Sequence, residues 1–182
     1  MMDLMIIGDP HAHPDYDNKR FEKLGKFIVK TKPDIVVCMG DFADMPSLSS
    51  YDRGTKGFEG KRYRKDIDAA LDAQERLLHP LKRMKNKPKK YMVLGNHEDR
   101  IDRLVNSTPE LDGAISIKDL SYNDYWKVTP FKKSLKLKNI HFSHYFPSGI
   151  MGRPISSVHI GHALITKLHC SAAQGHTHVY NH

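Results

Sequence analysis

Apolar residues in the first hundred positions alternate between short unbroken runs and longer stretches with helical spacing. Three unbroken runs each end in a turn that contains glycine, which is typical of buried strands. Two stretches between them, residues 18–30 and 66–84, carry apolar side chains three and four positions apart and predict helices. This alternation predicts a parallel sheet covered by helices. The predicted strands are Leu4–Ile7, Ile35–Met39 and Tyr91–Leu94.

The pattern changes after residue 117, where the apolar runs become shorter. A short helix is predicted before this point, at residues 99–105, and a longer one after it, at residues 154–168. The short runs predict a second sheet that is mostly antiparallel. Its expected strands are Lys127–Thr129, Ser134–Leu137, Ile140–Ser143 and Cys170–Gln174.

Polar clusters follow the three strands of the first half and the last strand of the second. Because the carboxyl ends of parallel strands meet at one edge of a sheet, we expect these clusters to lie together. Side-chain alternation along an extended segment would place Asp9 and His11 on one face. The same reasoning applies to His176 and His178. The clusters are Asp9-x-His11, Gly40–Asp41, Gly95–Asn96–His97 and Gly175–His176-x-His178.

A further histidine belongs to the strand predicted at residues 140–143. His144 directly follows this strand, whereas His141 lies within it and would point to the opposite face. We therefore assign His144 to the site. Carboxylate, amide and imidazole groups without cysteine form a ligand set that suits zinc, manganese, iron or nickel.

Composition narrows the class of protein. A chain of 182 residues predicts one domain, covering residues 1–182. Two cysteines exclude a disulfide scaffold and a cysteine-rich zinc module. No apolar run approaches the ~20 residues of a membrane span, so a soluble, cytoplasmic protein without a membrane partner is expected. The 29 basic and 21 acidic residues give a formal net charge of +8, which favours polyanionic partners.

Five segments, GDPHAH, MGDFAD, LGNHEDR, FSHYF and QGHTHV, occur in an order that resembles the calcineurin-like metallophosphoesterase superfamily. The resemblance extends from Asp9 to His178. It implies an α/β fold, a two-sheet β-sandwich flanked by helices, and hydrolysis of a phosphoester by water at two divalent metal ions. Manganese is the first expectation for these ions, with zinc, iron, nickel and cobalt as alternatives.

The resemblance also implies a role for each residue of the clusters. His97 would lie beside the scissile phosphate and serve the leaving group, and Asp44 would orient His97. Asp41 would bind both metal ions. The remaining ligands would be Asp9, His11 and His178 for the first ion and Asn96, His144 and His176 for the second.

Basic residues are concentrated in two segments. Residues 82–90 hold six cations and no acid, and we interpret them as a solvated loop at the amino end of a strand, opposite the site. Residues 53–65 hold six cations and one acid, lie in the long connection after Asp41, and are interleaved with aromatic side chains. Such a segment suits phosphates and bases of nucleic acid. Candidate substrate contacts are Arg62, Arg64, Arg100 and His13.

Three functions compete. We favour a phosphodiesterase or nuclease acting on nucleic acid or a nucleotide. The alternative is a phosphomonoesterase acting on a phosphoprotein or a small phosphate ester, because the same centre would hydrolyse both. A non-catalytic scaffold is the remote alternative. Glu98, which follows His97, is either a first-turn acid of a helix or a hydrogen-bond partner of a backbone amide in the metal loop.

The chain ends four residues after His178. Proteins that this sequence resembles usually continue with further strands of the second sheet. We therefore expect either a truncated chain that lacks these last strands, or an exposed sheet edge that a second subunit covers in a homo-oligomer.

Overall fold

Four parallel strands form the first sheet, in the order β1-β2-β3-β4. The computed structural model describes residues 2–178. The fourth strand corrects a prediction, because residues 127–129 pair in parallel with β3 and do not join the second sheet. A strand of three residues carries too little pattern to specify its partner. The strands are β1 (Leu4–Ile7), β2 (Ile35–Cys38), β3 (Lys89–Val93) and β4 (Lys127–Thr129).

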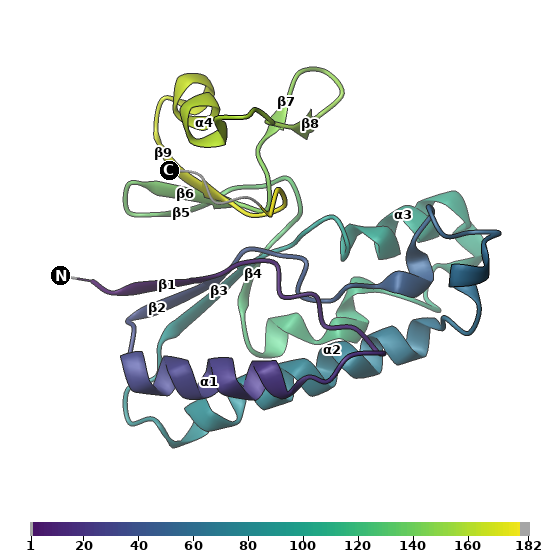
Figure 1. Cartoon of the computed structure of the whole chain (residues 1–182), viewed down its shortest axis with the longest axis horizontal. Helices are drawn as coiled ribbons and strands as arrows, with labels where there is room; N and C mark the ends of the chain where they lie inside the picture. Colours follow the sequence, from purple (N-terminus) through teal and green to yellow (C-terminus); the bar gives the residue numbers. More distant parts are fainter. Residues whose placement is uncertain (1, 179–182) are drawn as a thin grey trace.

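The helices α1 and α2 cover one face of this sheet (Figure 1). The helix α2 begins three residues earlier than predicted and ends at Leu78, where a 3₁₀ turn, Pro80–Arg83, replaces the expected continuation. Proline has no N–H to donate, so the α-helical hydrogen-bond pattern stops there. The helices of the first half are α1 (Lys19–Thr31), α2 (Tyr63–Leu78) and α3 (Asp99–Ser107).

A second sheet of three strands, in the order β5-β6-β9, packs on the opposite face (Figure 1). This sheet is mixed and not mostly antiparallel, since β6 runs antiparallel to β5 but parallel to β9. The helix α4 connects β6 to β9, begins later than predicted, and covers the outer face. The elements are β5 (Leu135–Leu137), β6 (Ile140–Ser143), α4 (Ile160–Leu168) and β9 (Ser171–Gln174).

Short elements fill the connections. Residues 153–154, predicted as the start of a helix, pair instead with residues 147–148 in a small hairpin. Two of the 3₁₀ turns lie in the long connection between β2 and α2. The hairpin strands are β7 (Pro147–Ser148) and β8 (Arg153–Pro154), and the further 3₁₀ turns are Pro46–Leu48, Lys56–Phe58, Pro109–Leu111, Ile117–Leu120 and Tyr122–Asp124.

The central strand β2 is buried on both faces and joins the two cores. Val36 and Cys38 pack against the helices, whereas Val37 and Met39 pack against Phe142 of the second sheet. This alternation with period two explains the unbroken apolar run in the sequence. The order of layers, helices, sheet, sheet and helix, confirms the predicted α/β fold with two sheets flanked by helices.

The expectation about the chain end concerns residues that follow His178, which lie outside the described part. Within residues 2–178, β9 pairs with β6 along one side only. In the same range, no helix combines the length and apolar character needed to cross a membrane.

Candidate metal centre

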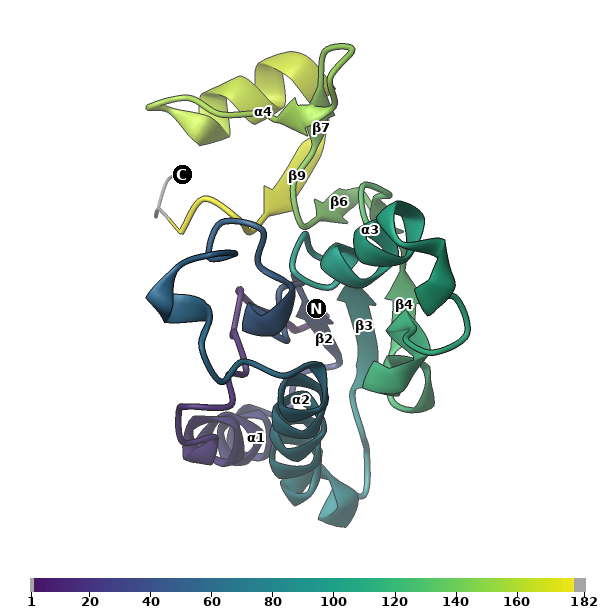
Figure 2. The ribbon, with the colours of Figure 1, turned by 90° about the vertical axis from the view of Figure 1, so that its right-hand side faces the viewer.

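Backbone hydrogen bonds join the turns that follow the strands of both sheets. The His11 amide donates to the Asp41 carbonyl at 2.9 Å, and the Gly175 amide donates to the His144 carbonyl at 3.0 Å. The two sheets are joined by the His176 amide, which donates to Asp9 Oδ2 at 2.6 Å. Figure 2 shows the turn after β1, the segment after β2 and the end of β9 side by side. The predicted clusters therefore meet at one edge.

Asp9, His11 and His178 form the first group of candidate ligands, with one ligand atom from each lying within 4.8 Å of the others. The Nε2 atoms of His11 and His178 are 3.5 Å apart, and His178 Nε2 lies 3.1 Å from Asp9 Oδ2. Asp9 Oδ1 is buried and has no hydrogen-bond partner among the described residues. A divalent cation would satisfy this oxygen, so the group fits a metal.

Asp41, His144 and His176 form a second group with the same spacing. His144 Nδ1 donates to the Met39 carbonyl at 2.9 Å, which directs Nε2 toward the group. This Nε2 lies 2.9 Å from Asn96 Oδ1, 3.2 Å from His176 Nδ1 and 3.3 Å from Asp41 Oδ2. Four potential ligand atoms thus converge from four different turns.

Asp41 links the two groups, because it also lies within 4.8 Å of ligand atoms of His11 and His97. Its carboxylate is almost fully buried and accepts the His97 amide on Oδ1 at 2.9 Å. Burial would raise the pKa of Asp41, but the hydrogen bond and charge of His144 lower it. The position between both groups is the one that a ligand shared by two ions requires.

Charge in the cluster favours cations. Burial alone would lower the pKa values of His11 and His144, but hydrogen bonds and charges of neighbouring carboxylates raise both. The same negative field would attract a divalent ion. Burial, followed by the charge of His144, lowers the pKa of His176 and so favours the neutral imidazole, which is the form that binds metals.

Asp44 connects the histidines of the cluster. Its Oδ1 lies 3.1 Å from His11 Nδ1 and 2.9 Å from His97 Nδ1, and its carbonyl oxygen accepts from His97 Nδ1 at 2.6 Å. Burial opposes ionisation, but the hydrogen bonds of His11 and His97 to the carboxylate hold the pKa of Asp44 far below its usual range. His13 also reaches this carboxylate, with Nε2 3.6 Å from Oδ2. Asp44 therefore orients the predicted ligand His11 together with His97.

Glu98 is fully buried and ties two of the turns together. Its Oε2 accepts the amides of Asp41 at 3.0 Å and Gly95 at 2.9 Å, and its Oε1 accepts the Ala43 amide at 3.0 Å and the Tyr122 hydroxyl at 3.2 Å. Burial and then the Asp41 charge raise the pKa of Glu98, while the amide donors oppose them. Of the two alternatives for Glu98, the backbone-bonding role is the one observed.

The local backbone differs from the extended geometry expected for the paired ligands. His11, His176 and His178 have φ values of 47°, 67° and 52°, in the left-handed region. Asp9 and His11 are therefore brought together by a turn and not by strand alternation, which is a correction. Such φ values cost energy for non-glycine residues and occur preferentially at functional sites.

Two glycines permit the close approach of backbone and carboxylate. A Cβ at Gly95 would collide with the Asp41 carboxylate, and a Cβ at Gly175 would collide with that of Asp9. The glycines that end the strands thus make room for the two carboxylates of the cluster.

The predicted substrate contacts divide into two sets. Arg100 lies in the cluster, where Nη2 donates to His97 Nε2 at 3.1 Å and Nη1 donates to the Asp44 carbonyl at 2.9 Å. Arg62 and Arg64 have partners elsewhere: Arg62 donates to the adjacent Lys61 carbonyl, and Arg64 pairs with an aspartate one turn along α2. Their side chains face solvent.

Two contributors to the site were not predicted. Arg20 on α1 donates to the carbonyls of Pro10 and His11 at 3.1 and 2.6 Å, and so holds the first turn. The Tyr122 hydroxyl donates a hydrogen bond to Glu98, although the two residues are 24 positions apart in the sequence. Neither residue belongs to a local motif, so the sequence contains no signal for these roles.

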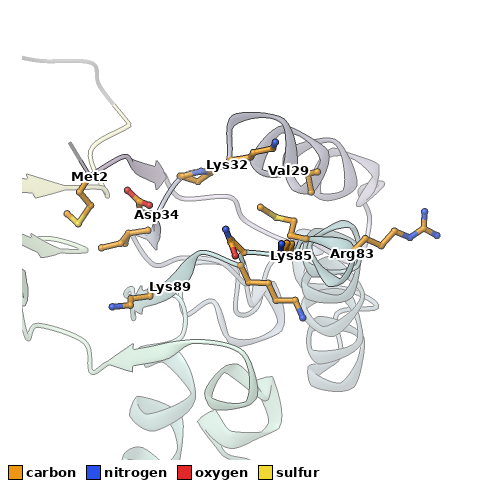
Figure 3. Close-up of a pocket in the computed structure, with 12 residues that line it drawn as sticks. Met2, Val29, Lys32, Asp34, Arg83, Lys85 and Lys89 are labelled. Atoms are coloured by element: carbon orange, nitrogen blue, oxygen red, sulfur yellow. The ribbon is translucent and has the colours of Figure 1, made fainter.

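A large hollow lies away from this cluster, at the amino ends of the strands (Figure 3). It has a volume of about 910 Å³. Its lining includes Val29, Met84, Asp34 and five cations, Lys32, Arg83, Lys85, Lys87 and Lys89. The basic segment at residues 82–90 thus lies at the amino edge as predicted, with most of its cations exposed, and it also borders this hollow.

The profile of the calcineurin-like phosphoesterase family matches residues 2–180. Two similar proteins are the Gene 54 proteins of Mycobacterium phages L5 and D29. Each is 32% identical over 100 residues, which cover 55% of this chain and 36% of the phage protein. The match therefore spans about a third of the length of these relatives and carries no function with it. Given the family profile, the two-sheet fold and the cluster at its edge, the chain belongs to the calcineurin-like phosphoesterase family of metal-dependent hydrolases that act on phosphoester bonds.

Proposed function

We propose that the chain is a phosphodiesterase with two divalent metal ions that acts on nucleic acid or a nucleotide. The observation that carries the proposal is the position of Asp41, whose buried carboxylate lies between two groups of candidate ligands. One ion would be held by Asp41 with Asp9, His11 and His178, and the other by Asp41 with Asn96, His144 and His176.

Two divalent ions in such a site activate water and stabilise charge on phosphoryl oxygens. Manganese is our first assignment, because nitrogen and oxygen ligands without thiolate suit it, although zinc, iron, nickel and cobalt accept the same set. The two aspartates leave a net positive site when both ions are bound, which would attract a phosphoester.

His97 is the proposed proton donor to the leaving oxygen. Its Nδ1 is engaged by Asp44, so Nε2 is the nitrogen that faces the cluster. In the structure this Nε2 accepts a hydrogen bond from Arg100. On substrate binding, Arg100 Nη2 would donate to the substrate phosphate instead of to His97. His97 Nε2 would then take up a proton from solvent and donate it to the leaving oxygen.

Charge around the centre supports a polyanionic substrate. The chain carries a formal charge of +8, and the connection after β2 brings a basic segment to the catalytic edge. In the same connection, just before this segment, Tyr51 is 90% exposed and offers a ring on which a base can stack. Arg62, Arg64 and His13 are proposed to contact the substrate, with His13 nearest the cluster through Asp44.

We also propose that residues 1–182 form one domain, because β2 contributes alternate side chains to both cores. We further propose a homo-oligomer in which a second subunit pairs with the side of β9 that has no partner strand within residues 2–178.

The substrate proposal is tested with the manganese-loaded protein against three substrates: bis(p-nitrophenyl) phosphate, p-nitrophenyl phosphate and a single-stranded DNA oligonucleotide. We expect the diester and the oligonucleotide to be hydrolysed with higher kcat/KM than the monoester. Faster hydrolysis of the monoester, with the oligonucleotide intact, would establish a phosphomonoesterase instead. No turnover of any substrate with manganese or the other ions would favour a scaffold.

A further inference from the structure

A small basic hollow lies between the connection after β2 and the helix α3. Its volume is about 130 Å³, and its lining contains three arginines and no acid. We call it the arginine hollow. Its lining residues are Leu48, Ser50, Arg53, Arg100, Arg103, Leu104 and Ser107.

Arg100 makes the arginine hollow continuous with the metal centre. Its guanidinium is fixed by the carbonyls of Asp44 and Met45 at 2.9 and 3.1 Å and contacts His97 Nε2 at 3.1 Å. Arg103, one turn further along α3, donates to the carbonyl of the candidate ligand Asn96 at 3.2 Å. Arg100 therefore borders both the hollow and His97, the residue proposed to serve the leaving group.

The charges in the arginine hollow are not balanced. Arg103 pairs with Asp99 on α3, but within residues 2–178 no hydrogen bond or ion pair engages the exposed Arg53. Burial lowers the pKa of Arg100, although the charges of Asp44, Asp41 and Asp52 oppose this effect. Guanidinium groups with unused donors bind phosphate oxygens strongly and in defined geometry.

We propose that the arginine hollow binds a second phosphate group of the substrate, next to the scissile one. The inference rests on the proposed phosphodiesterase function and specifies its substrate class. Substrates would be diesters that carry a further phosphate on the same chain, as in an internal position of a nucleic-acid strand or a dinucleotide with a terminal phosphate. A diester with a single phosphate would leave the hollow without an anion.

The test compares three thymidine dinucleotides with the manganese-loaded protein: one with only the linking phosphate, one with an added 5′-phosphate and one with an added 3′-phosphate. One of the phosphorylated forms should have a kcat/KM at least roughly tenfold above the unphosphorylated form, the effect of about one charge-assisted hydrogen bond. Arg53→Ala and Arg103→Ala should each bring this ratio toward one, and Arg103→Lys should retain part of it.

Arg83→Ala is the matched control, because it removes the same charge at the opposite edge of the sheet. It should leave the ratio unchanged. A ratio near one in the unmodified protein, with all three dinucleotides hydrolysed, would overturn the inference while the phosphodiesterase proposal stands. A loss of preference in Arg83→Ala equal to that in Arg53→Ala would also overturn it, because the effect would then be one of overall charge.

A binding measurement tests the arginine hollow independently of the proposed phosphodiesterase activity. Dinucleotides with a methylphosphonate link, with and without the terminal phosphate, are titrated into the manganese-loaded protein. Tighter binding of the phosphorylated form, lost in Arg53→Ala, supports the arginine hollow even if no diester is hydrolysed. Equal affinities for both forms would contradict it.

Discussion

The two edges of the parallel sheet present opposite kinds of surface. The amino edge has a large hollow of about 910 Å³, lined by five cations and by apolar side chains (Figure 3). The hollows beside the metal cluster at the carboxyl edge are smaller, at about 130 and 190 Å³, and a third of about 460 Å³ is lined by His13. Size alone would point to the wrong edge. Convergent ligand atoms and fixed hydrogen bonds distinguish the carboxyl edge as the candidate site.

The physical difference between the edges is how firmly the polar groups are held. At the carboxyl edge, Asp41 and Glu98 are buried, and Glu98 accepts four hydrogen bonds. At the amino edge, Lys32, Lys87 and Lys89 are exposed. Buried charges are costly unless they are paired or bind metals, so their concentration at one edge points to function there.

The largest effect is expected from Asp41→Asn, which removes the carboxylate shared by both groups. Outer-shell partners of a metal contribute ~10–100-fold to affinity, and a shared ligand should exceed this range. We expect loss of most bound metal by elemental analysis and of nearly all turnover. Full activity of Asp41→Asn in the presence of saturating chelator would contradict the assignment of a metal centre to the carboxyl edge.

His97→Ala should retain both metal ions and lose roughly 10²–10⁴ in rate, the range for a general acid. The loss should shrink for esters with a good leaving group, because these need no proton. Rates with p-nitrophenyl and ethyl leaving groups provide the measurement. Loss of metal in this variant would make His97 a ligand and contradict its assigned role.

Glu98→Gln tests whether stability and metal binding at the carboxyl edge depend on the buried Glu98 carboxylate. The amide nitrogen of glutamine would face backbone donors, and hydrogen bonds to a charged group contribute ~1.5–3 kcal/mol each. We expect a loss of ~2–4 kcal/mol in the free energy of unfolding in urea, with weaker metal binding. The exposed Glu110→Gln is the control and should stay within ~0.5 kcal/mol of the unmodified protein. Equal stability of both variants would refute the role of Glu98.

The smallest effect is expected from removing charge near each edge. Changing Arg62, Arg64 and Lys65 to alanine should weaken binding of single-stranded DNA and lower its salt slope by about two, from ~0.7 per phosphate contact. The control changes Arg83, Lys85 and Lys87 to alanine at the amino edge. We expect little change in the salt slope in this control. Equal salt slopes in both triple variants would indicate that residues 62–65 are a solvated segment that does not contact DNA.

The sequence predicted the parallel sheet and the set of converging turns because both have local signals. Unbroken apolar runs identify β1, β2 and β3, and each is followed by glycine with a polar side chain. The partner of β4 could not be predicted, since its three residues carry no pattern that selects a sheet. The mixed pairing of β9 depends on the crossover through α4, whose start was also misplaced.

The sequence predicted that these clusters lie close together, but not the backbone geometry that brings them together. The left-handed backbone at His11 and His178 is fixed by neighbouring turns, such as the His11 amide bonded to Asp41, and not by local sequence. The support of Glu98 by Tyr122 and the contribution of Arg103 to the arginine hollow arise only when distant segments pack together.

The number of manganese ions bound per chain tests the central claim most directly. The protein is stripped with chelator, titrated with manganese, and analysed for bound metal by elemental analysis and calorimetry. The account predicts two ions per chain in the unmodified protein, and the same number in a variant with the amino-edge cations removed. Binding of one ion or none would contradict a two-metal centre formed around Asp41.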